Sequence, residues 1–359
     1  MLIDIETALP PFRVSQKFAA EKLKIVMGNN PVVSRMIDAI SVNSGIEYRY
    51  TVVANADNSL RDKFYFDNDK YLMQDTKARM HEYEFWSKTL SIKAVDSIIS
   101  KNKIDVNNIG KIVTVSCTGF FAPGIDCEII KHFSLPTNIK RTNIGFMGCA
   151  AAITGFNSVF DTIKCKPSES VLMIAVELCS LHLQNTPTKD NLLASMLFAD
   201  GCAAAFFSNN KVDNKTAVKI IKTHTMLFDS TAEYMGWKIG NYGFEMILSN
   251  ELPKLIFEYA CPSLCEFLKE NNIDLKSIKH WALHPGGRAI IDSLQKGLNL
   301  TDEQTEPSRK ILRDYGNMSS PSILFVLKEL LNKIKKDELC CAVAFGPGLT
   351  MEVALMKGV

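Results

Sequence analysis

Three residues of this 359-residue chain combine a reactive or polar side chain with a setting suited to acyl transfer: Cys149, His284 and Asn317. Cys149 follows the apolar run IGFMG and opens the small-residue run AAAITG, a pattern that predicts a thiol at the start of a tightly packed helix. The helix dipole and free backbone N–H groups there favour the thiolate, so Cys149 is a candidate nucleophile. For any one of ten cysteines, however, a buried structural role is the commoner case.

His284 ends the apolar, strand-like stretch KHWALH and is followed by PGG, which cannot continue a strand. We therefore expect its imidazole at the end of a strand, where α/β sheets present functional groups. Asn317 lies between a helix-breaking glycine and the cap-like SSP, where it could be a turn residue or an amide donor to an oxyanion. The three could form a nucleophile, its activator and an oxyanion donor, but spacing alone does not bring them together.

Composition excludes several classes of function. The formal net charge of +2 indicates neither a nucleic-acid partner nor a charged membrane surface. No apolar run approaches the roughly 20 residues that span a bilayer, and the first residues lack the pattern of a secretion signal. The ten cysteines form no CxxC pair, and CPSLC (261–265) fits one helix face, so we expect reduced thiols and a cytoplasmic protein.

Apolar, β-branched runs alternate with helical patterns, which predicts an α/β fold. The predicted strands of the first half are 111–117, 140–146, 170–178 and 201–208, with helices between them. In the second half we expect a long helix over 251–272, a strand over 279–285, two further helices and a final strand pair bent at GPG (346–348). The polar stretch 208–215 divides two similar halves, 1–212 with Cys149 and 213–359 with His284 and Asn317.

Eight segments in this order resemble the type III polyketide synthases, the chalcone-synthase-like branch of the thiolase-fold condensing enzymes. They are SCTGFFAPGID, RTNIGFMGCAAAITG, AVELCSLH, LFADGCAAAFF, GFEMILSNELPKLI, ALHPGGRAIIDSL, LRDYGNMSSPSILFVL and AFGPGLTMEVALM. The resemblance implies a homodimer whose chain forms two pseudo-symmetric halves in a five-layered α-β-α-β-α thiolase-like fold. It also implies a catalytic triad of Cys149, His284 and Asn317.

The implied activity is that of an acyltransferase. Cys149 would take an acyl starter from a coenzyme A thioester, and decarboxylation of malonyl-CoA would supply the enolate that extends it. His284 would pair with the thiolate and lower the pKa of Cys149, and His284 and Asn317 would donate hydrogen bonds to the enolate oxygen. The product would be a pyrone, a resorcinol or a related aromatic. No metal and no tightly bound cofactor is implied.

The resemblance also assigns a pocket. Phe198 and Phe244 match the phenylalanines that flank the catalytic cysteine, and His182, Ser319 and the region of Met235 and Gly236 match positions beside the cavity. Ala122 replaces a methionine that in plant members reaches into the partner's cavity, and the added apolar space favours a long-chain fatty acyl starter over an aromatic one.

The expected coenzyme A site differs from that of plant members. Arg35 matches a residue that binds coenzyme A phosphates there, but neighbouring lysines are replaced by Val32 and Ala39. Either Arg49, Lys63 or another base supplies the missing charge, or an acyl carrier protein delivers the starter.

Other functions compete with this one. A ketoacyl synthase III would use the same three residues for a single condensation, and a catalytically silent thiolase-fold scaffold would bind a thioester or a partner subunit. A hydroxymethylglutaryl-CoA synthase would need a glutamate near the cysteine, which the match at Cys149 does not provide. A papain-like hydrolase has a different pattern around its cysteine.

Overall fold

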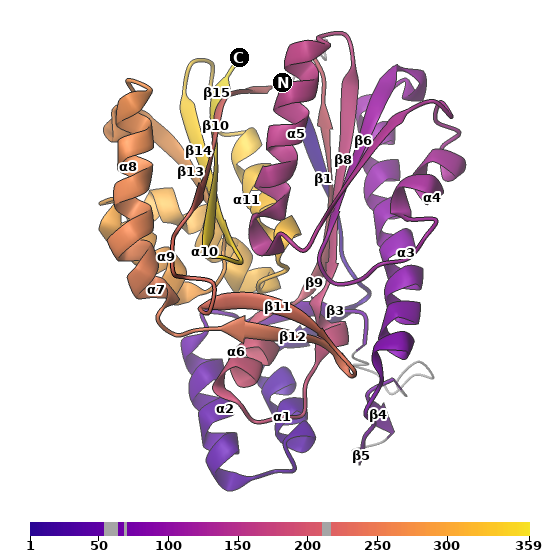
Figure 1. The fold of residues 1–359 in the computed structure, drawn as a ribbon, viewed down its shortest axis with the longest axis vertical. Helices are drawn as coiled ribbons and strands as arrows, with labels where there is room; N and C mark the ends of the chain where they lie inside the picture. The colour runs from indigo at the N-terminus through magenta and orange to yellow at the C-terminus, as the bar shows by residue number, and fades with distance from the viewer. Residues whose placement is uncertain (54–63, 68–69, 210–216) are drawn as a thin grey trace.

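The computed structural model describes residues 1–53, 64–67, 70–209 and 217–359. Nine strands of this described part form one hydrogen-bonded series, β13-β14-β15-β10-β1-β9-β8-β6-β7 (Figure 1). Five come from the first half of the chain: β1 (Leu2–Ala8), β6 (Ile109–Ser116), β7 (Lys140–Gly145), β8 (Ser170–Leu178) and β9 (Asp200–Phe207). Four come from the second half: β10 (Val218–Leu227), β13 (Ile278–Leu283), β14 (Leu339–Gly346) and β15 (Thr350–Gly358).

The series consists of two similar sheets joined at a narrow seam. In each half the first strand pairs antiparallel with the last strand, the last pairs antiparallel with the one before it, and that strand has a parallel neighbour. Among the described residues the strands of the two halves pair with each other only at β1 and β10, where the register joins Leu2 with Val218. This repeat of topology supports the expected pseudo-symmetry. The predicted boundary at residues 212 and 213 lies outside the described residues.

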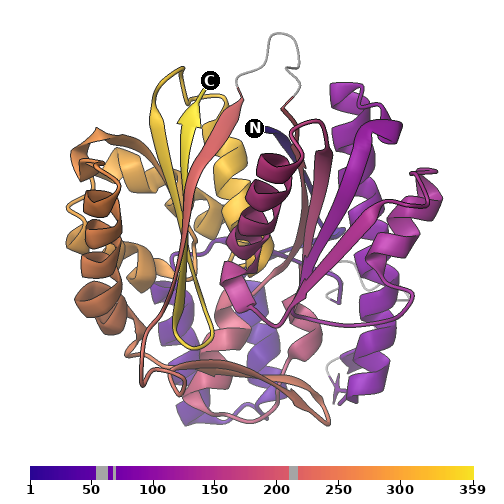
Figure 2. The same ribbon diagram turned by 45° about the horizontal axis from the view of Figure 1, so that its top comes forward.

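Helices cover both sheets and fill the space between them. α5 (Ala151–Cys165) and α11 (Ser320–Leu331) pack between the two sheets and share one apolar core with both inner faces (Figure 2). α3 (Thr76–Asn102) and α4 (Ile125–His132) cover the outer face of the first sheet. α8 (Cys261–Glu270), α9 (Arg288–Gly297) and α10 (Asp302–Tyr315) cover the second. The five layers confirm the predicted thiolase-like α/β fold.

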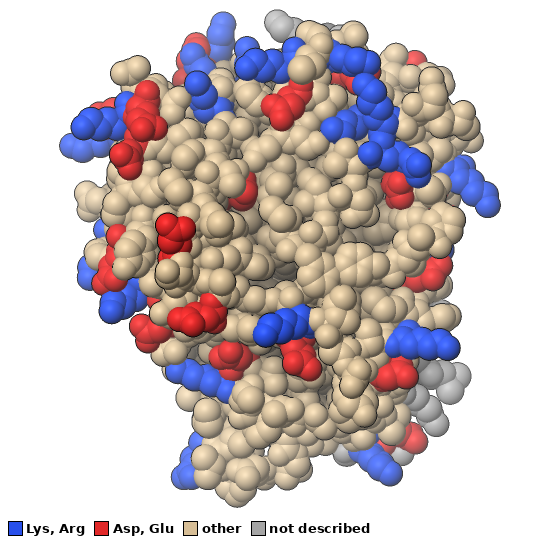
Figure 3. Space-filling view, in the orientation of Figure 1, with Lys and Arg blue, Asp and Glu red and all other residues tan. Residues whose placement is uncertain are grey.

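Smaller elements form a cap at the lower end of both sheets in the view of Figure 1. They are α1 (Gln16–Val26), α2 (Pro31–Asn43), α6 (Lys189–Leu197), the short α7 (Leu252–Leu255), and the pairs β2–β3 (Phe12–Ser15 with Tyr48–Thr51), β4–β5 (Phe66–Asp67 with Lys70–Tyr71) and β11–β12 (Met235–Gly240 with Gly243–Leu248). The rim of the face in Figure 3 carries most of its acidic and basic side chains, and the centre is largely uncharged.

Two local patterns differ from the sequence prediction. The helix expected over 251–272 is α7 and α8 joined by a π-helical turn, Ile256–Ala260. The strand β1 is not among the predicted strands, since the acids Asp4 and Glu6 interrupt its apolar pattern; both pair with Lys101 of α3, and Glu6 also pairs with Lys328 of α11. No helix in the described ranges is both long and apolar enough to cross a membrane.

Candidate active site

Cys149 lies in a 3-10 turn, Gly148–Ala150, directly before α5. The backbone turns sharply between β7 and this point, with positive φ at Phe146 (56°) and Gly148 (61°). A Cβ on Gly148 would also lie 2.4 Å from Cδ of Pro347, in the turn between β14 and β15. Only glycine fits at position 148, which explains why a glycine precedes Cys149. The position of Cys149 directly before α5 confirms the predicted thiol at a helix start.

His284 follows β13, as predicted, and its backbone N–H donates to the carbonyl of Val343 at 2.9 Å. The residue is 2% exposed, and neither ring nitrogen has a hydrogen-bond partner among the described residues. A buried imidazole with both nitrogens unused is costly to the fold, which is the pattern expected of a group that acts on a ligand.

Asn317 sits between α10 and α11, and its backbone is fixed by its neighbours. Its N–H donates to the carbonyl of Leu197 at 2.9 Å, and its carbonyl accepts from the N–H of Ala199 at 2.8 Å. In the side chain, Nδ2 donates to the carbonyl of Gly286 at 3.1 Å and Oδ1 accepts from the N–H of Ser319 at 2.8 Å. One Nδ2 hydrogen therefore remains for another acceptor.

The three residues come together, because Cys149, His284 and Asn317 line a single cavity of about 60 Å³. Phe198 and Ser319 line it too, as do Met235 and Gly236 of β11. The side chains of Ser319 and Asn317 lie beside the Cys149 thiol and act to lower its pKa. A nucleophile, a base and an amide donor around one small cavity are the parts that acyl transfer requires.

Burial dominates the charge state of each group taken alone. It raises the pKa of Cys149 to about 12, although the neighbouring side chains of Ser319 and Asn317 oppose that rise. It lowers the pKa of His284 to about 3. Both pKa shifts favour a neutral thiol and a neutral imidazole, whereas the sequence predicts a thiolate–imidazolium pair. That pair needs direct proton transfer from Sγ to the imidazole, since the mutual attraction of the two charges must offset most of their desolvation.

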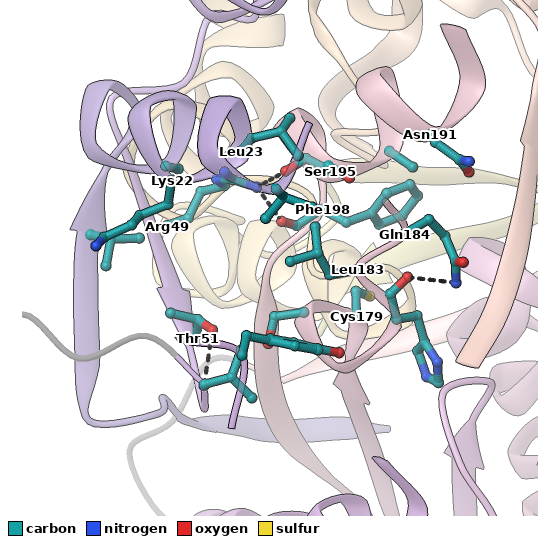
Figure 4. A pocket seen from close by; sticks show the side chains of 18 of the residues that line it. Lys22, Leu23, Arg49, Thr51, Cys179, Leu183, Gln184, Asn191, Ser195 and Phe198 are labelled. Atoms are coloured by element: carbon teal, nitrogen blue, oxygen red, sulfur yellow. Dashed lines mark hydrogen bonds between the residues drawn. The ribbon is translucent and has the colours of Figure 1, made fainter. Parts of the chain in front are cut away.

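A larger cavity of about 410 Å³ adjoins the first one (Figure 4). The two share four lining residues: Cys179, Phe198, Trp237 and Met246. The larger cavity extends under α1 and α6, where Val14, Phe18, Leu23 and Ala194 line it. Its volume falls in the range of small-molecule sites, and it shares a wall with the cavity that holds Cys149.

Comparison with known proteins identifies the family. Residues 29–235 match the family described as FAE1/Type III polyketide synthase-like protein, and residues 219–359 match the chalcone and stilbene synthases, C-terminal domain. The chain belongs to the type III polyketide synthases. Members of this family are acyltransferases, so the chain is an enzyme of that type.

Individual relatives and a solved structure agree with this family assignment. The alpha-pyrone synthesis polyketide synthase-like Pks18 of Mycobacterium tuberculosis is 30% identical over 76% of this chain and 71% of its own length. A putative chalcone synthase of Bacillus subtilis is 29% identical over 99% of this chain and 98% of its own. The crystal structure of PKS-I from the brown alga Ectocarpus siliculosus matches with a TM-score of 0.91 and 31% identity, covering 100% of this chain and 98% of that one.

The residues expected to line the pocket of this type III synthase do not all lie in the same cavity. Phe198 lines both cavities, whereas Phe244 and His182 line only the larger one. Ser319 lies beside the thiol, as expected. Ala122 is exposed in the loop after β6 and lines neither cavity of its own chain.

The residues expected to bind coenzyme A are also separated. Arg35 is exposed on α2 and lines neither cavity. Arg49, considered from sequence as a source of phosphate-binding charge, is instead buried beside the larger cavity. Lys63 lies outside the described residues.

Sequence reasoning missed Glu177, a fully buried carboxylate near the nucleophile. Its oxygens accept from the N–H of Cys117 (2.9 Å) and from the hydroxyls of Thr118 (2.8 Å) and Ser320 (2.7 Å). Burial raises its pKa to about 7, and its charge contributes to the raised pKa of Cys149. An acid does therefore lie near Cys149, but it lines neither cavity. The sign available in the sequence was a lone acid inside the apolar strand SVLMIAVEL.

Trp237 was also missed. Its indole N–H donates to the carbonyl of Cys117 at 2.7 Å, and its ring lies between the cavities. The hairpin that carries it shows no sequence signal beyond an ordinary apolar alternation, so only the fold reveals this position.

Proposed function

We propose that this synthase extends an acyl starter held on Cys149 with several malonyl-CoA units, by decarboxylative Claisen condensation, and releases a cyclised product. The observation that supports it is the shared small cavity of Cys149, His284 and Asn317, next to a cavity large enough for a growing chain. Cys149, His284 and Asn317 are the catalytic residues in this proposal.

Loading begins when His284 takes the proton of Cys149. The thiolate attacks the thioester carbonyl of the starter, the carbon–sulfur bond to coenzyme A breaks, and the departing thiolate recovers the proton from His284. The starter is then a thioester of Cys149. The position of Cys149 at the start of α5 assists this step, because the helix N-terminus stabilises negative charge on sulfur.

Extension requires stabilisation of an enolate. Loss of carbon dioxide from malonyl-CoA leaves its electron pair on the α-carbon, with negative charge on the thioester oxygen. Asn317 can donate its remaining Nδ2 hydrogen to that oxygen, and neutral His284 can donate its ring N–H. The α-carbon then attacks the acyl group on Cys149, a carbon–carbon bond forms, and the Cys149 thiolate leaves. Each donor of this kind contributes about 10² to 10³ in rate.

A long-chain fatty acyl starter is favoured over an aromatic one. The larger cavity has the volume for an extended apolar chain and is lined under α1 and α6 by aliphatic and aromatic side chains. The mycobacterial relative is named for alpha-pyrone synthesis, which favours a pyrone among the possible products.

Coenzyme A carries both substrates in this proposal, with an acyl carrier protein as the alternative donor of the starter. We further propose a homodimer and a cytoplasmic location. β7 is one of the two edge strands of the series, and residues 140, 141 and 143 on it are exposed, so we propose this edge for the second copy.

Mass spectrometry of products from the purified enzyme, malonyl-CoA and a panel of acetyl-, octanoyl-, palmitoyl- and coumaroyl-CoA tests the function. We expect multiply extended, cyclised products from octanoyl and palmitoyl starters. One added two-carbon unit would indicate a ketoacyl synthase III, no product a silent scaffold, and turnover of coumaroyl-CoA alone would overturn the fatty acyl starter.

Ala194 offers a test of which cavity holds the starter. It lies on α6 and lines only the larger cavity, so Ala194→Phe places a ring in that space without touching the small one. We expect this variant to lose palmitoyl-CoA turnover while retaining acetyl-CoA turnover, which serves as its internal control. Unchanged palmitoyl turnover would place the acyl chain elsewhere.

A further inference from the structure

Arg49 is a buried cation on β3 that touches neither the nucleophile nor its base. Its side chain is 7% exposed, and Nη1 donates to the backbone carbonyls of Ser195 at 2.6 Å and Phe198 at 2.7 Å (Figure 4). These carbonyls lie at the end of α6, where helical carbonyls lack intrahelical partners. Burial lowers the pKa of Arg49 only to about 10, with Asp200 opposing the shift, so the guanidinium stays charged at neutral pH.

The segment that Arg49 holds is also the segment that holds Asn317. Leu197 accepts the backbone N–H of Asn317, and the N–H of Ala199 donates to the carbonyl of Asn317, so the end of α6 and the Asn317 loop are joined on both sides of Phe198. The stem of Arg49 contacts the loop directly, because a Cβ on Gly316 would lie 2.9 Å from Cγ of Arg49. One side chain thus contacts both Phe198 and the residue before Asn317.

The geometry points to Arg49 as a positioning residue for the proposed condensation. We infer that its two hydrogen bonds and its stem fix the Asn317 amide relative to Cys149 and fix the Phe198 ring between the two cavities. The inference rests on the proposed function, since it acts through Asn317. A shift of about 1 Å in a catalytic donor can cost about 100-fold in rate, so loss of this contact should slow the step that needs the amide.

Arg79 provides a matched control. It is also fully buried, and its Nη1 donates to two carbonyls, those of Leu181 and Leu183, each at 2.9 Å. Neither carbonyl belongs to the segment bonded to Asn317. Arg79→Met therefore removes the same kind of buried hydrogen bonds from a segment that is not hydrogen-bonded to Asn317.

The decisive experiment is a double-mutant cycle on malonyl-CoA decarboxylation, with starter loading measured in parallel as the mass of the acyl-enzyme. We expect Arg49→Met to lower the kcat of decarboxylation by about 10- to 100-fold while loading, which forms no enolate for the Asn317 amide to stabilise, changes by less than about 3-fold. Arg49→Lys, which keeps the charge and can reach one carbonyl, should recover part of the loss. Folded Arg79→Met should keep the wild-type decarboxylation rate.

In an Asn317→Ala background, Arg49→Met should cost little further rate, because the amide it positions is gone. The inference would be overturned if Arg49→Met lowered the decarboxylation rate by the same factor with and without Asn317→Ala, or if Arg79→Met lowered it as much as Arg49→Met does. If Arg49→Met does not fold, as judged by circular dichroism, Arg49→Lys completes the same cycle. Absence of decarboxylation by the wild-type enzyme would instead contradict the proposed function.

Discussion

His182 accepts a hydrogen bond from the backbone N–H of Phe244 at 2.9 Å through Nδ1, and the two rings stack with centroids 4.3 Å apart. Because Nδ1 is the acceptor, the proton is on Nε2, which donates to the carbonyl of Thr118 at 2.8 Å. Burial lowers the pKa of His182 to about 3, so the ring stays neutral. His182 therefore links β12 to the loop after β6 and has no ring nitrogen left for a substrate.

Replacing His182 should destabilise the fold and loosen the wall of the larger cavity. In His182→Ala the N–H of Phe244 and the carbonyl of Thr118 both lose their partner, at roughly 1–3 kcal/mol for each buried group. We expect a lower free energy of unfolding in urea and a broader range of product lengths. His182→Gln, whose amide can both accept and donate, is the control and should retain more of both properties. Equal stability of the alanine variant would contradict this account.

His284 should control the reactivity of Cys149. Burial alone raises the pKa of the thiol to about 12, so without the imidazole the thiolate fraction at pH 7 becomes very small and rises tenfold per pH unit. We expect wild-type Cys149 to react with iodoacetamide at pH 7 faster than the other nine cysteines. In His284→Ala this rate should fall and then climb steadily up to pH 9.5. Peptide mass spectrometry of timed samples measures both. Identical profiles would exclude His284 as the proton acceptor.

The layers of the fold could be predicted because several of its strands, such as β8, β9 and β14, are buried on both faces. β8, for example, reads SVLMIAVEL, and every residue in it is buried. β1 could not be predicted in the same way, because the charges of Asp4 and Glu6 are matched by Lys101 and Lys328, about a hundred and about three hundred residues away. The local apolar pattern of a segment indicates whether it is buried, but it does not indicate an ion pair with a residue far away in the sequence.

The triad was predictable from the family resemblance, whereas its surroundings were not. Glu177, Trp237 and Arg49 act through backbone groups of other segments, so no short motif marks them. The rise that burial alone causes in the pKa of Cys149 could not be predicted either, because helix position and a histidine partner can be read from sequence but the depth of burial cannot.

Asn317 should matter for decarboxylation more than for loading. Asn317→Asp keeps the oxygen that accepts the N–H of Ser319 but replaces both amide hydrogens with a negative charge, so Asn317→Ala, which adds no charge, is needed to isolate the loss of the donor. We expect malonyl-CoA decarboxylation to fall by about 10² to 10³, as for removal of one oxyanion donor. Asn317→Ala should fall similarly. Release of acetyl-CoA and carbon dioxide measures the step, and a near-normal rate in both variants would remove Asn317 from the mechanism.

Glu177 should give the enzyme a stability that depends on pH. Its folded pKa of about 7 lies above the value of 4.5 expected when unfolded, so between these values the folded state holds more protons. Stability from this group is therefore present below pH 4.5 and is lost as the pH rises through about 7. The shift corresponds to about 3 kcal/mol in total.

Glu177→Gln tests this without breaking the network. Its carbonyl can accept from Cys117 and Thr118, and its amide can donate to the hydroxyl of Ser320, which rotates to accept. Other buried groups, Asp200 among them, titrate alike in both proteins and cancel in the difference. We expect the unfolding free energy of the variant, minus that of the wild type, to grow by up to about 3 kcal/mol from pH 5 to pH 8 in urea titrations. A difference that stays constant over this range would mean that Glu177 does not titrate there and remains ionised in the folded enzyme.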